Sequence, residues 1–304
     1  MPRWIEIALT TDGEAAEAIA QELYPFCHQG LSIEQLGIMP GAWDDGDVPP
    51  PTAVVVRGYF LEDERAESTR AEIERILGYL NMMYPMPTPE YRLVDDEDWA
   101  EAWKANYHPV RLGRRIFIRP LWVEAEAEPQ DIVISLDPGM AFGTGTHPTT
   151  QLCLEALEDH VKPGQQVLDL GCGSGILAIA AAKLGAAHVL GVDIDDVARR
   201  VTDENAAVNG VAQQITARTG TLEDVLATGQ TFDLIVVNIL ARVIISMCQQ
   251  GLGQTLRPGG QAILSGLILE QADEVEAALR QAGFIPTARR LQGDWVAIEA
   301  HKVA

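Results

Sequence analysis

The feature that most constrains this chain is the apolar, glycine-rich segment of residues 167–193, VLDLGCGSGILAIAAAKLGAAHVLGVD. It starts with a short apolar run that suits a buried strand. Three alternating glycines follow, and then an Ala-rich stretch typical of a helix packed on a sheet. A second apolar strand ends on Asp193. Glycines let the backbone approach a ligand closely, and a carboxylate at a strand end accepts hydrogen bonds from ribose hydroxyls. The segment therefore predicts a nucleoside-binding unit.

The spacing of the glycines indicates which nucleoside fits this unit. The dinucleotide fingerprint G-x-G-x-x-G requires a third glycine at position 176, where this chain has Ile176. The glycines instead lie at positions 171, 173 and 175, with Asp169 ahead of them. The resulting pattern, D-x-G-x-G-x-G, resembles the first motif of the class I S-adenosylmethionine-dependent methyltransferases.

Composition excludes several classes of protein. The chain has 304 residues, of which 47% are hydrophobic and 22% charged, as in a soluble globular protein with a substantial core. No apolar run approaches the ~20 residues of a membrane-spanning helix, and the N-terminal residues lack the pattern of a secretory signal. The four cysteines are widely scattered. We therefore expect reduced thiols, no metal site, no membrane partner and a cytoplasmic location.

The net charge of −22 argues against general binding to a nucleic-acid backbone, which requires a basic surface. The acidic excess is uneven, because residues 1–106 contain 21 acidic and only 7 basic residues. Solubility explains this excess, and so does electrostatic steering of a basic partner. The charge alone leaves both explanations open.

The first third of the chain predicts a small separate domain. Its apolar patterns follow the order β-α-β-β-α-β, over residues 3–10, 13–26, 31–36, 53–60, 63–80 and 91–94. This is the order of the ferredoxin-like split motif, an α+β sheet with helices on one face. We expect a binding or scaffold domain at residues 1–94, joined to the rest by a linker helix at 95–106.

Residues 107–304 predict an α/β domain with a doubly wound sheet. Two strands that we expect to be antiparallel, at 114–122 and 131–136, lead into it. Further strands are expected at 167–170, 188–192, 214–218, 232–237 and 261–267, and helices at 149–160, 176–184, 196–209, 241–256 and 270–282. Two closing strands, 284–291 and 295–301, flank a tight turn and predict a hairpin. An alternating series that ends in an antiparallel hairpin is the methyltransferase variant of this fold.

A loop of unusual composition, DPGMAFGTGTHPTT, precedes the first strand of this sheet at residues 137–150. It is too rich in Gly, Thr and Pro for a regular element, yet it contains Phe142 and His147. Its position predicts that it lies near the carboxyl ends of the strands, where ligands bind in doubly wound sheets. We expect the loop to cover a cofactor. Phe142 would pack on the cofactor or, alternatively, in the core, and His147 would structure the loop or, alternatively, act as an acid or base.

Three segments together resemble the PrmA family, the bacterial methyltransferases of large-subunit ribosomal protein eleven. They are FGTGTHPTT at 142–150, DLGCGSGILAIAAAKLGA at 169–186 with GVDID at 191–195, and NIL at 238–240. The resemblance covers roughly residues 95–304 by motif and the first domain by layout. It implies that S-adenosylmethionine donates methyl groups to lysine side chains and the N-terminal amine of the basic, lysine-rich stalk-base protein. From the net charge of −22, we expect no direct nucleic-acid partner.

The resemblance also implies a set of cofactor contacts. The matching residues are Thr150, Gly171, Asp193 and Asn238, to which we add Gly173 and Phe142. Asp193 would bind the ribose hydroxyls, and the glycine backbone would approach the methionine part of the cofactor. Free N–H groups of the helix that starts near Ser174 would bind the methionine carboxylate.

Asn238 is the predicted catalytic residue, because it ends a buried strand at the edge where the cofactor is expected. Its side chain would accept a hydrogen bond from the incoming amine and aim the nitrogen lone pair at the sulfonium methyl group. Asn238 also suits a different role, the cap of the helix expected at 241–256.

Two other functions remain open at this point. The first is a class I N-methyltransferase that acts on another protein or on a small-molecule amine. A glutamine acceptor would favour N-P-P-Y at the strand end, whereas Asn238 is followed by Ile239 and Leu240. The second is a nucleotide-binding regulatory module without catalysis, which the intact Asp193, Asn238 and 137–150 loop disfavour.

Overall fold

The computed structural model of the chain describes residues 3–11, 13–23, 25–27, 31–36, 53–81, 86–95, 109–136, 145 and 147–303. The chain divides into two compact units, Met1–Tyr107 and His108–Ala304, which we describe one at a time. Most of the linker helix predicted at 95–106 lies outside the described residues. Within the described residues, no helix is both long enough and apolar enough to cross a membrane.

The first unit contains an antiparallel sheet and two helices. Its elements are β1 (Arg3–Thr11), α1 (Gly13–Leu23), β2 (Leu31–Leu36), β3 (Ala53–Leu61), α2 (Ala66–Leu80) and β4 (Glu90–Asp95). The strand order is β2-β3-β1-β4, and each neighbouring pair is antiparallel. This combination of element order and strand order is that of the ferredoxin-like split motif.

Alternation along the strands determines which face of this sheet the helices cover. Ile7 and Leu9 of β1 are completely buried in one apolar cluster with alternate residues of β3. Ile19 and Leu23 of α1 and Ile73 of α2 belong to the same cluster. Because both helices bury their apolar stripes in one cluster, they pack on the same face of the sheet.

The second unit begins with a small sheet and continues as an alternating series. Its elements are β5 (Val110–Leu112), β6 (Ile116–Pro120), β7 (Ile132–Leu136), α4 (Pro148–His160), β8 (Gln166–Leu170), α5 (Ile176–Lys183), β9 (His188–Asp193), α6 (Asp196–Val208), β10 (Ile215–Thr219), α7 (Leu222–Ala227), β11 (Phe232–Asn238), α8 (Ala241–Gln250), the 3₁₀ helix η3 (Leu252–Thr255), β12 (Leu256–Ile268), the 3₁₀ helix η4 (Leu269–Gln271), α9 (Ala272–Gln281), β13 (Phe284–Gln292) and β14 (Trp295–Lys302).

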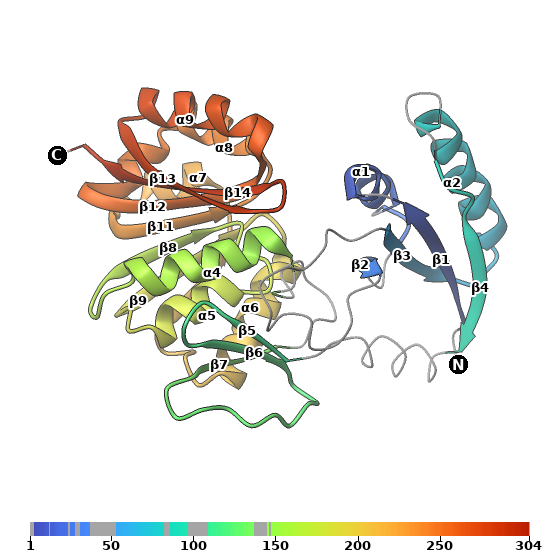
Figure 1. Cartoon of the computed structure of the whole chain (residues 1–304), viewed down its shortest axis with the longest axis horizontal. Coiled ribbons are helices and arrows are strands. Elements are labelled where there is room, and N and C mark those ends of the chain that lie inside the picture. The colour runs from blue at the N-terminus through green and yellow to red at the C-terminus, as the bar shows by residue number, and fades with distance from the viewer. Residues whose placement is uncertain are drawn as a thin grey trace. The chain divides into compact units, whose positions relative to one another are not determined.

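A mixed sheet of order β10-β9-β8-β11-β12-β14-β13 forms the centre of this unit (Figure 1). The strands from β10 to β12 are parallel, and β14 runs antiparallel to both β12 and β13. The structure therefore confirms the predicted class I methyltransferase fold, a doubly wound sheet that ends in an antiparallel hairpin.

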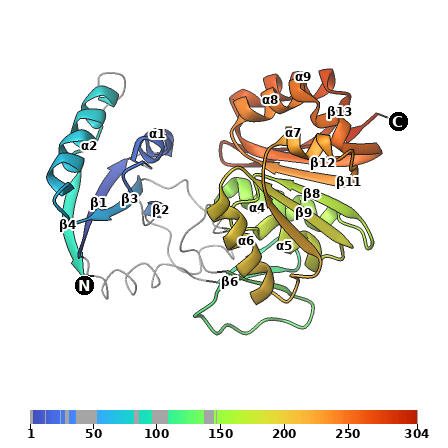
Figure 2. The same ribbon diagram turned by 180° about the vertical axis from the view of Figure 1, so that it is seen from behind.

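Helices cover both faces of the central sheet, as a parallel sheet requires. Alternate residues of β11 enter two different clusters: Leu234 and Val236 pack with α4 and α5, whereas Ile235 and Val237 pack with α8 and α9. Both views place α8 and α9 on one side of the sheet and α4 on the other (Figures 1 and 2). The small sheet β5-β6-β7 adds its apolar residues to the cluster of α4 and α5.

Three local predictions were wrong. The helix expected at 241–256 ends at Gln250, because Gly251 adopts a left-handed conformation (φ 104°) that stops it. Helix α7 was not expected; it is short and starts with a capping box between Thr221 and Asp224. The expected strand 114–122 begins at Ile116, and it pairs with β7 in parallel because the long connection of residues 121–131 lets the chain return in the same direction.

Candidate functional site

The carboxyl ends of β8, β9 and β11 form the edge where the predicted site residues meet. In the parallel register, Leu170 lies opposite both Val192 and Val237. Gly171, Asp193 and Asn238 each follow one of these paired residues directly. Three of the predicted site residues therefore lie on adjacent strands at one edge of the sheet.

The turn after β8 requires its glycines for two reasons. Gly171, Gly173 and Gly175 all have positive φ, with values of 77°, 52° and 79°. A Cβ on Gly171 would lie 2.5 Å from the Ile239 side chain, and one on Gly175 would lie 2.8 Å from Thr202. Both the backbone conformation and the available space therefore exclude larger residues, and the turn leaves its backbone close to the strand edge.

Asp193 is held in a fixed orientation toward the glycine turn. Its Oδ2 accepts a hydrogen bond from the Gly173 N–H at 2.9 Å, and its Oδ1 accepts one from the Asp195 N–H at 3.0 Å. Each carboxylate oxygen has a further lone pair for an additional donor, and the residue is partly exposed. The carboxylate therefore fits a ligand that presents two neighbouring hydroxyls, such as a ribose.

The start of α5 differs from the prediction. We expected free N–H groups there for the methionine carboxylate, but two of them already have partners. The Ile176 N–H donates to Ser174 Oγ at 3.4 Å, and the Ala178 N–H donates to Asp169 Oδ2 at 3.0 Å. Those two groups are therefore not available to a ligand in this arrangement.

Asp169 is a completely buried carboxyl group beneath the glycine turn. One of its oxygens is the acceptor for Ala178, and the other, Oδ1, has no hydrogen-bond partner among the described residues. Burial raises the pKa of Asp169 to about 7, and the nearby charge of Asp193 contributes to the rise. The sequence pattern marked this residue only as part of the motif and did not indicate its burial.

The pKa of Asp169 predicts how stability depends on pH. Because its pKa is higher in the folded than in the unfolded chain, the folded chain binds the proton more tightly between about pH 4 and 7. Stability should therefore fall as pH rises through this range. Asp169→Asn keeps the acceptor for Ala178 but cannot ionise, so we expect it to remove a pH-dependent loss of roughly 2–4 kcal/mol. Denaturant unfolding at pH 5 and pH 8 measures this; parallel pH profiles of the two proteins would contradict the assignment.

Asn238 contacts Thr150, which lies in the first turn of α4. The Asn238 Nδ2 group donates to Thr150 Oγ1 at 3.3 Å, and Thr150 is buried. With the amide nitrogen directed to Thr150, no donor among the described residues bonds the Asn238 Oδ1 atom, which remains an acceptor. The alternative role as a helix cap is excluded, because the N-cap residue of α8 is Leu240.

His147 structures the start of α4. It is the N-cap residue, its Nδ1 accepts a hydrogen bond from the Thr149 N–H at 3.3 Å, and Nδ1 also lies 2.7 Å from Thr149 Oγ1. Burial lowers the pKa of His147 to about 4. The ring is therefore neutral at physiological pH and acts as a cap, as expected. Phe142, expected to pack on the cofactor, lies outside the described residues.

The hairpin at the end of the chain contributes to the site, which the sequence did not predict. The Trp295 ring packs edge-to-face on His147, with ring centroids 4.6 Å apart. Gln292 Nε2 donates to Gln151 Oε1 at 2.9 Å. Both contacts join segments that are distant in the sequence, so no local pattern reveals them.

The described residues fit S-adenosylmethionine. A nucleoside needs a fixed acceptor for its ribose, which Asp193 provides, and close backbone approach, which the glycine turn provides. Asn238 and Thr150 add polar atoms on the adjacent strand and helix. Within the part of the chain that the structure describes, no group of His, Cys, Asp or Glu side chains is arranged to hold a metal ion.

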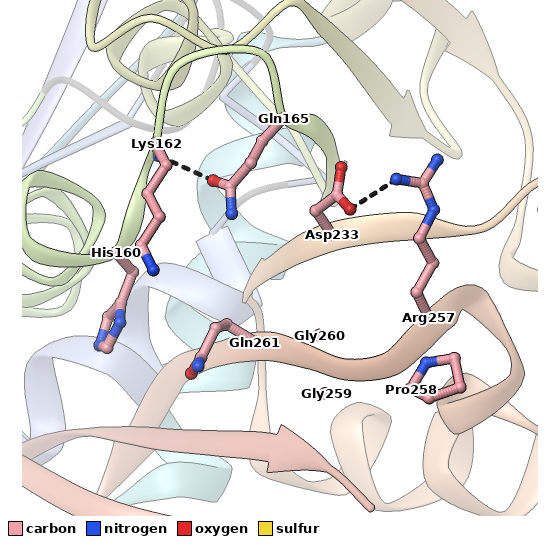
Figure 3. A pocket seen from close by; sticks show the side chains of 9 residues that line it. All are labelled: His160, Lys162, Gln165, Asp233, Arg257, Pro258, Gly259, Gly260 and Gln261. Atoms are coloured by element: carbon pink, nitrogen blue, oxygen red, sulfur yellow. Dashed lines mark hydrogen bonds and ion pairs between the residues drawn. The ribbon is translucent and has the colours of Figure 1, made fainter. Parts of the chain in front are cut away.

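A separate cavity of about 220 Å³ lies at the opposite, amino end of the strands (Figure 3). Its walls include Lys162, Asp233 and Arg257, and it contains no predicted site residue. Arg257 Nη1 and Asp233 Oδ1 form an ion pair at 2.5 Å, and Asp233 Oδ2 accepts from the Gln166 N–H. These bonds fix the starts of β8, β11 and β12 relative to one another and thus serve the fold.

Comparison with known proteins agrees with this geometry. The family model described as "Ribosomal protein L11 methyltransferase (PrmA)" matches residues 3–303. Ribosomal protein L11 methyltransferases of Chloroflexus aurantiacus and Listeria monocytogenes are each 41% identical, with 97% of both chains covered. The crystal structure of a ribosomal protein L11 methylase from Lactobacillus delbrueckii subsp. bulgaricus is 37% identical with a TM-score of 0.60, and it covers 65% of this chain and 100% of its own.

Proposed function

Because this chain belongs to the ribosomal protein L11 methyltransferase (PrmA) family, with S-adenosylmethionine as methyl donor, we propose that it methylates amines of ribosomal protein L11. The acceptors would be lysine side chains and the N-terminal amine. The observation that carries this proposal is the Asn238 amide, whose Oδ1 is left as an acceptor at the same sheet edge as Gly171 and Asp193. Membership in a methyltransferase family overturns the alternative of a regulatory module without catalysis.

The cofactor would be held by residues of the strand edge. Asp193 would accept from the ribose hydroxyls, and the backbone at Gly171 and Gly173 would lie against the methionine part. When bound, S-adenosylmethionine supplies an electrophilic methyl group. Thr150 would keep the Asn238 amide in one orientation through its hydroxyl, and a direct contact of Thr150 with the cofactor stays a prediction.

The chain's task in the reaction is to present a neutral, correctly directed amine. Lysine has a pKa of about 10.4 in water, so its ammonium must lose a proton before it can attack. Moving the amine from water into a less polar site lowers its pKa, and a water molecule then accepts the proton. Asn238 Oδ1 accepts one N–H of the amine, which directs the nitrogen lone pair. Alignment of the two reactants supplies most of the rate gain.

Mass spectrometry of the acceptor tests the amine specificity. Purified L11 is incubated with the enzyme and S-adenosylmethionine, digested, and its modified peptides are fragmented to locate each methyl group. We expect methyl groups on lysine Nζ atoms and on the N-terminal amine. Methyl groups confined to glutamine, arginine or carboxylate side chains would contradict the proposal.

We also propose separate tasks for the domains: acceptor binding by residues 1–94, a linker at 95–106 and catalysis by 107–304. Two observations support this division. The sheet edge that carries Asp193 and Asn238 belongs to the second unit. Residues 1–106 carry an acidic excess that suits the binding of a basic partner protein. A ribosomal protein as substrate would place the activity in the cytoplasm.

Deletion of residues 1–94 should separate these tasks. Among the described residues, the two apolar clusters that His108–Ala304 contains are built from residues of that unit, so we expect the remaining chain to keep its own core. We expect L11 methylation at limiting acceptor concentration to fall at least about 10-fold, with S-adenosylmethionine affinity changed less than about 2-fold. Calorimetry and initial rates measure the two effects. A truncated protein that methylates L11 as well as the full chain would contradict the division.

A further inference from the structure

The turn between β13 and β14, residues 292–295, is fixed at the rim of the site. It is attached to the first turns of α4 through the Gln292–Gln151 hydrogen bond and the Trp295–His147 ring contact. On its other side, the Leu269 N–H donates to the Asp294 carbonyl at 2.8 Å. Since the same first turn of α4 carries Thr150, which bonds Asn238, the turn lies near the residue that we propose to orient the amine.

Asp294 presents an uncompensated negative charge on this turn. Its side chain is exposed, and among the described residues its carboxylate has neither an ion pair nor a hydrogen bond. Three other acids near the hairpin are paired with basic side chains. Their pairs are Glu299 with Arg290 and His160, and Asp273 and Glu276 with Arg289. The carboxylate of Asp294 is therefore available to a cation that a partner supplies.

Exposed leucines lie on the loops that adjoin the turn. Leu240, two residues after Asn238, is 50% exposed, and Leu269, which bonds the turn through its backbone, is 48% exposed. The Ile239 N–H donates to the Ser265 carbonyl, so the loop that carries Leu240 runs beside the end of β12, where Leu269 follows. A single exposed leucine is common on soluble proteins, but large apolar side chains beside an unpaired charge at a site rim are typical of an interaction surface.

We propose that these residues form an acceptor-docking rim, defined as residues 292–295 with Leu240 and Leu269. The rim binds the polypeptide segment that flanks the target amine. Asp294 pairs with a lysine or arginine of that segment, and the two leucines contact its apolar side chains. This proposal rests on the proposed function, in which the acceptor is a protein. It assigns to the catalytic unit a surface that recognises the residues around each methylated amine.

The occupant is specified by charge and by position. A segment of a lysine-rich protein carries cations close to any target lysine, and Asp294 is the described acid of this rim that has no internal cation. The rim includes Leu240, two residues after Asn238, so a chain that places an amine at Asn238 would lie close to part of the rim. A free small-molecule amine would reach Asn238 without contacting Asp294.

Steady-state kinetics with purified L11 test this rim. At low salt, Asp294→Asn should raise the KM for L11 about 2- to 5-fold, and Asp294→Lys should raise it about 10-fold or more, because it places like charges together. The kcat and the S-adenosylmethionine Kd should stay within about 2-fold of wild type. Leu269→Ser should also raise the KM for L11, and added salt should not reduce this rise. Added salt should reduce the rise in KM caused by the two Asp294 substitutions, because salt screens charge interactions.

Glu204→Gln is the matched control, because Glu204 is an exposed acid of α6 without an ion pair among the described residues. An unchanged KM in Asp294→Lys, with wild-type enzyme active on L11, overturns the docking rim and leaves the proposed function intact. An equal rise in KM for Glu204→Gln also overturns it, since the effect would then reflect net charge. If the wild-type enzyme methylates no protein acceptor, the proposed function fails, and the rim fails with it.

Discussion

Replacing Asp193 with alanine is expected to weaken S-adenosylmethionine binding about 100-fold. The carboxylate would accept hydrogen bonds from two ribose hydroxyls, and bonds to a charged group contribute about 1.5–3 kcal/mol each. The substitution also removes the acceptor for the Gly173 N–H, which fixes the glycine turn. A total of roughly 3 kcal/mol corresponds to the expected loss of affinity. Isothermal titration of the purified protein with S-adenosylmethionine measures it.

Two controls separate binding from folding. Asp193→Asn keeps one side-chain acceptor in nearly the same shape, so its loss of affinity should be smaller than that of Asp193→Ala. Asp203→Asn removes an exposed acid of α6, paired with Arg199, and should leave the affinity unchanged. The thermal unfolding transitions of the Asp193 and Asp203 variants should remain cooperative. An Asp193→Ala protein that folds and binds the cofactor with wild-type affinity would show that Asp193 does not bind the ribose.

Replacing Asn238 with alanine is expected to lower kcat about 100-fold while the L11 KM stays within about 3-fold. The amide would act on the amine only when the two reactants are aligned, and loss of one preorganised hydrogen-bond partner of a reacting group typically has an effect of this size. Single-turnover measurements with saturating cofactor give the rate of the chemical step directly. Unchanged turnover in a folded Asn238→Ala protein would falsify the catalytic assignment.

Thr150 provides the matched variant for this second prediction. Thr150→Val keeps the shape of the side chain but removes the hydroxyl that accepts from Asn238 Nδ2. We expect a smaller loss of kcat than in Asn238→Ala, because the amide stays present and loses only its fixed orientation. The double variant should be no slower than Asn238→Ala alone, since the two residues act through one hydrogen bond. Additive effects would indicate that Thr150 acts on the cofactor independently.

The fold was predictable where local chemistry determines the structure. Apart from Asp233, the run FDLIVV at 232–237 is apolar on both faces, which is typical of a central strand covered on both sides. The glycine turn, the helix after it and the closing hairpin follow from similar local patterns. The stop at Gly251 and the parallel pairing of β6 with β7 were missed. A glycine within an apolar run does not by itself show where a helix ends, and strand direction depends on partners distant in the sequence.

The site was predictable only in part, for a related reason. Gly171, Asp193 and Asn238 could be grouped because parallel strands bring their carboxyl ends to one edge. The free helix N–H groups could not be assessed, because the acceptors Ser174 and Asp169 are fixed by packing. The rim formed by the β13–β14 turn depends on contacts with α4 that no spacing indicates. The packing of Phe142 on the cofactor stays a prediction.

The central claim is that this chain transfers methyl groups from S-adenosylmethionine to ribosomal protein L11. Its most direct test is to incubate the full-length protein with methyl-labelled S-adenosylmethionine and total ribosomal proteins from a strain that lacks this enzyme, and then to resolve the proteins by electrophoresis. We expect one dominant labelled band, identified by its peptides as L11, and labelling about 100-fold slower with the Asn238→Ala protein. Label on a different protein, or none with the wild-type enzyme, would contradict the claim.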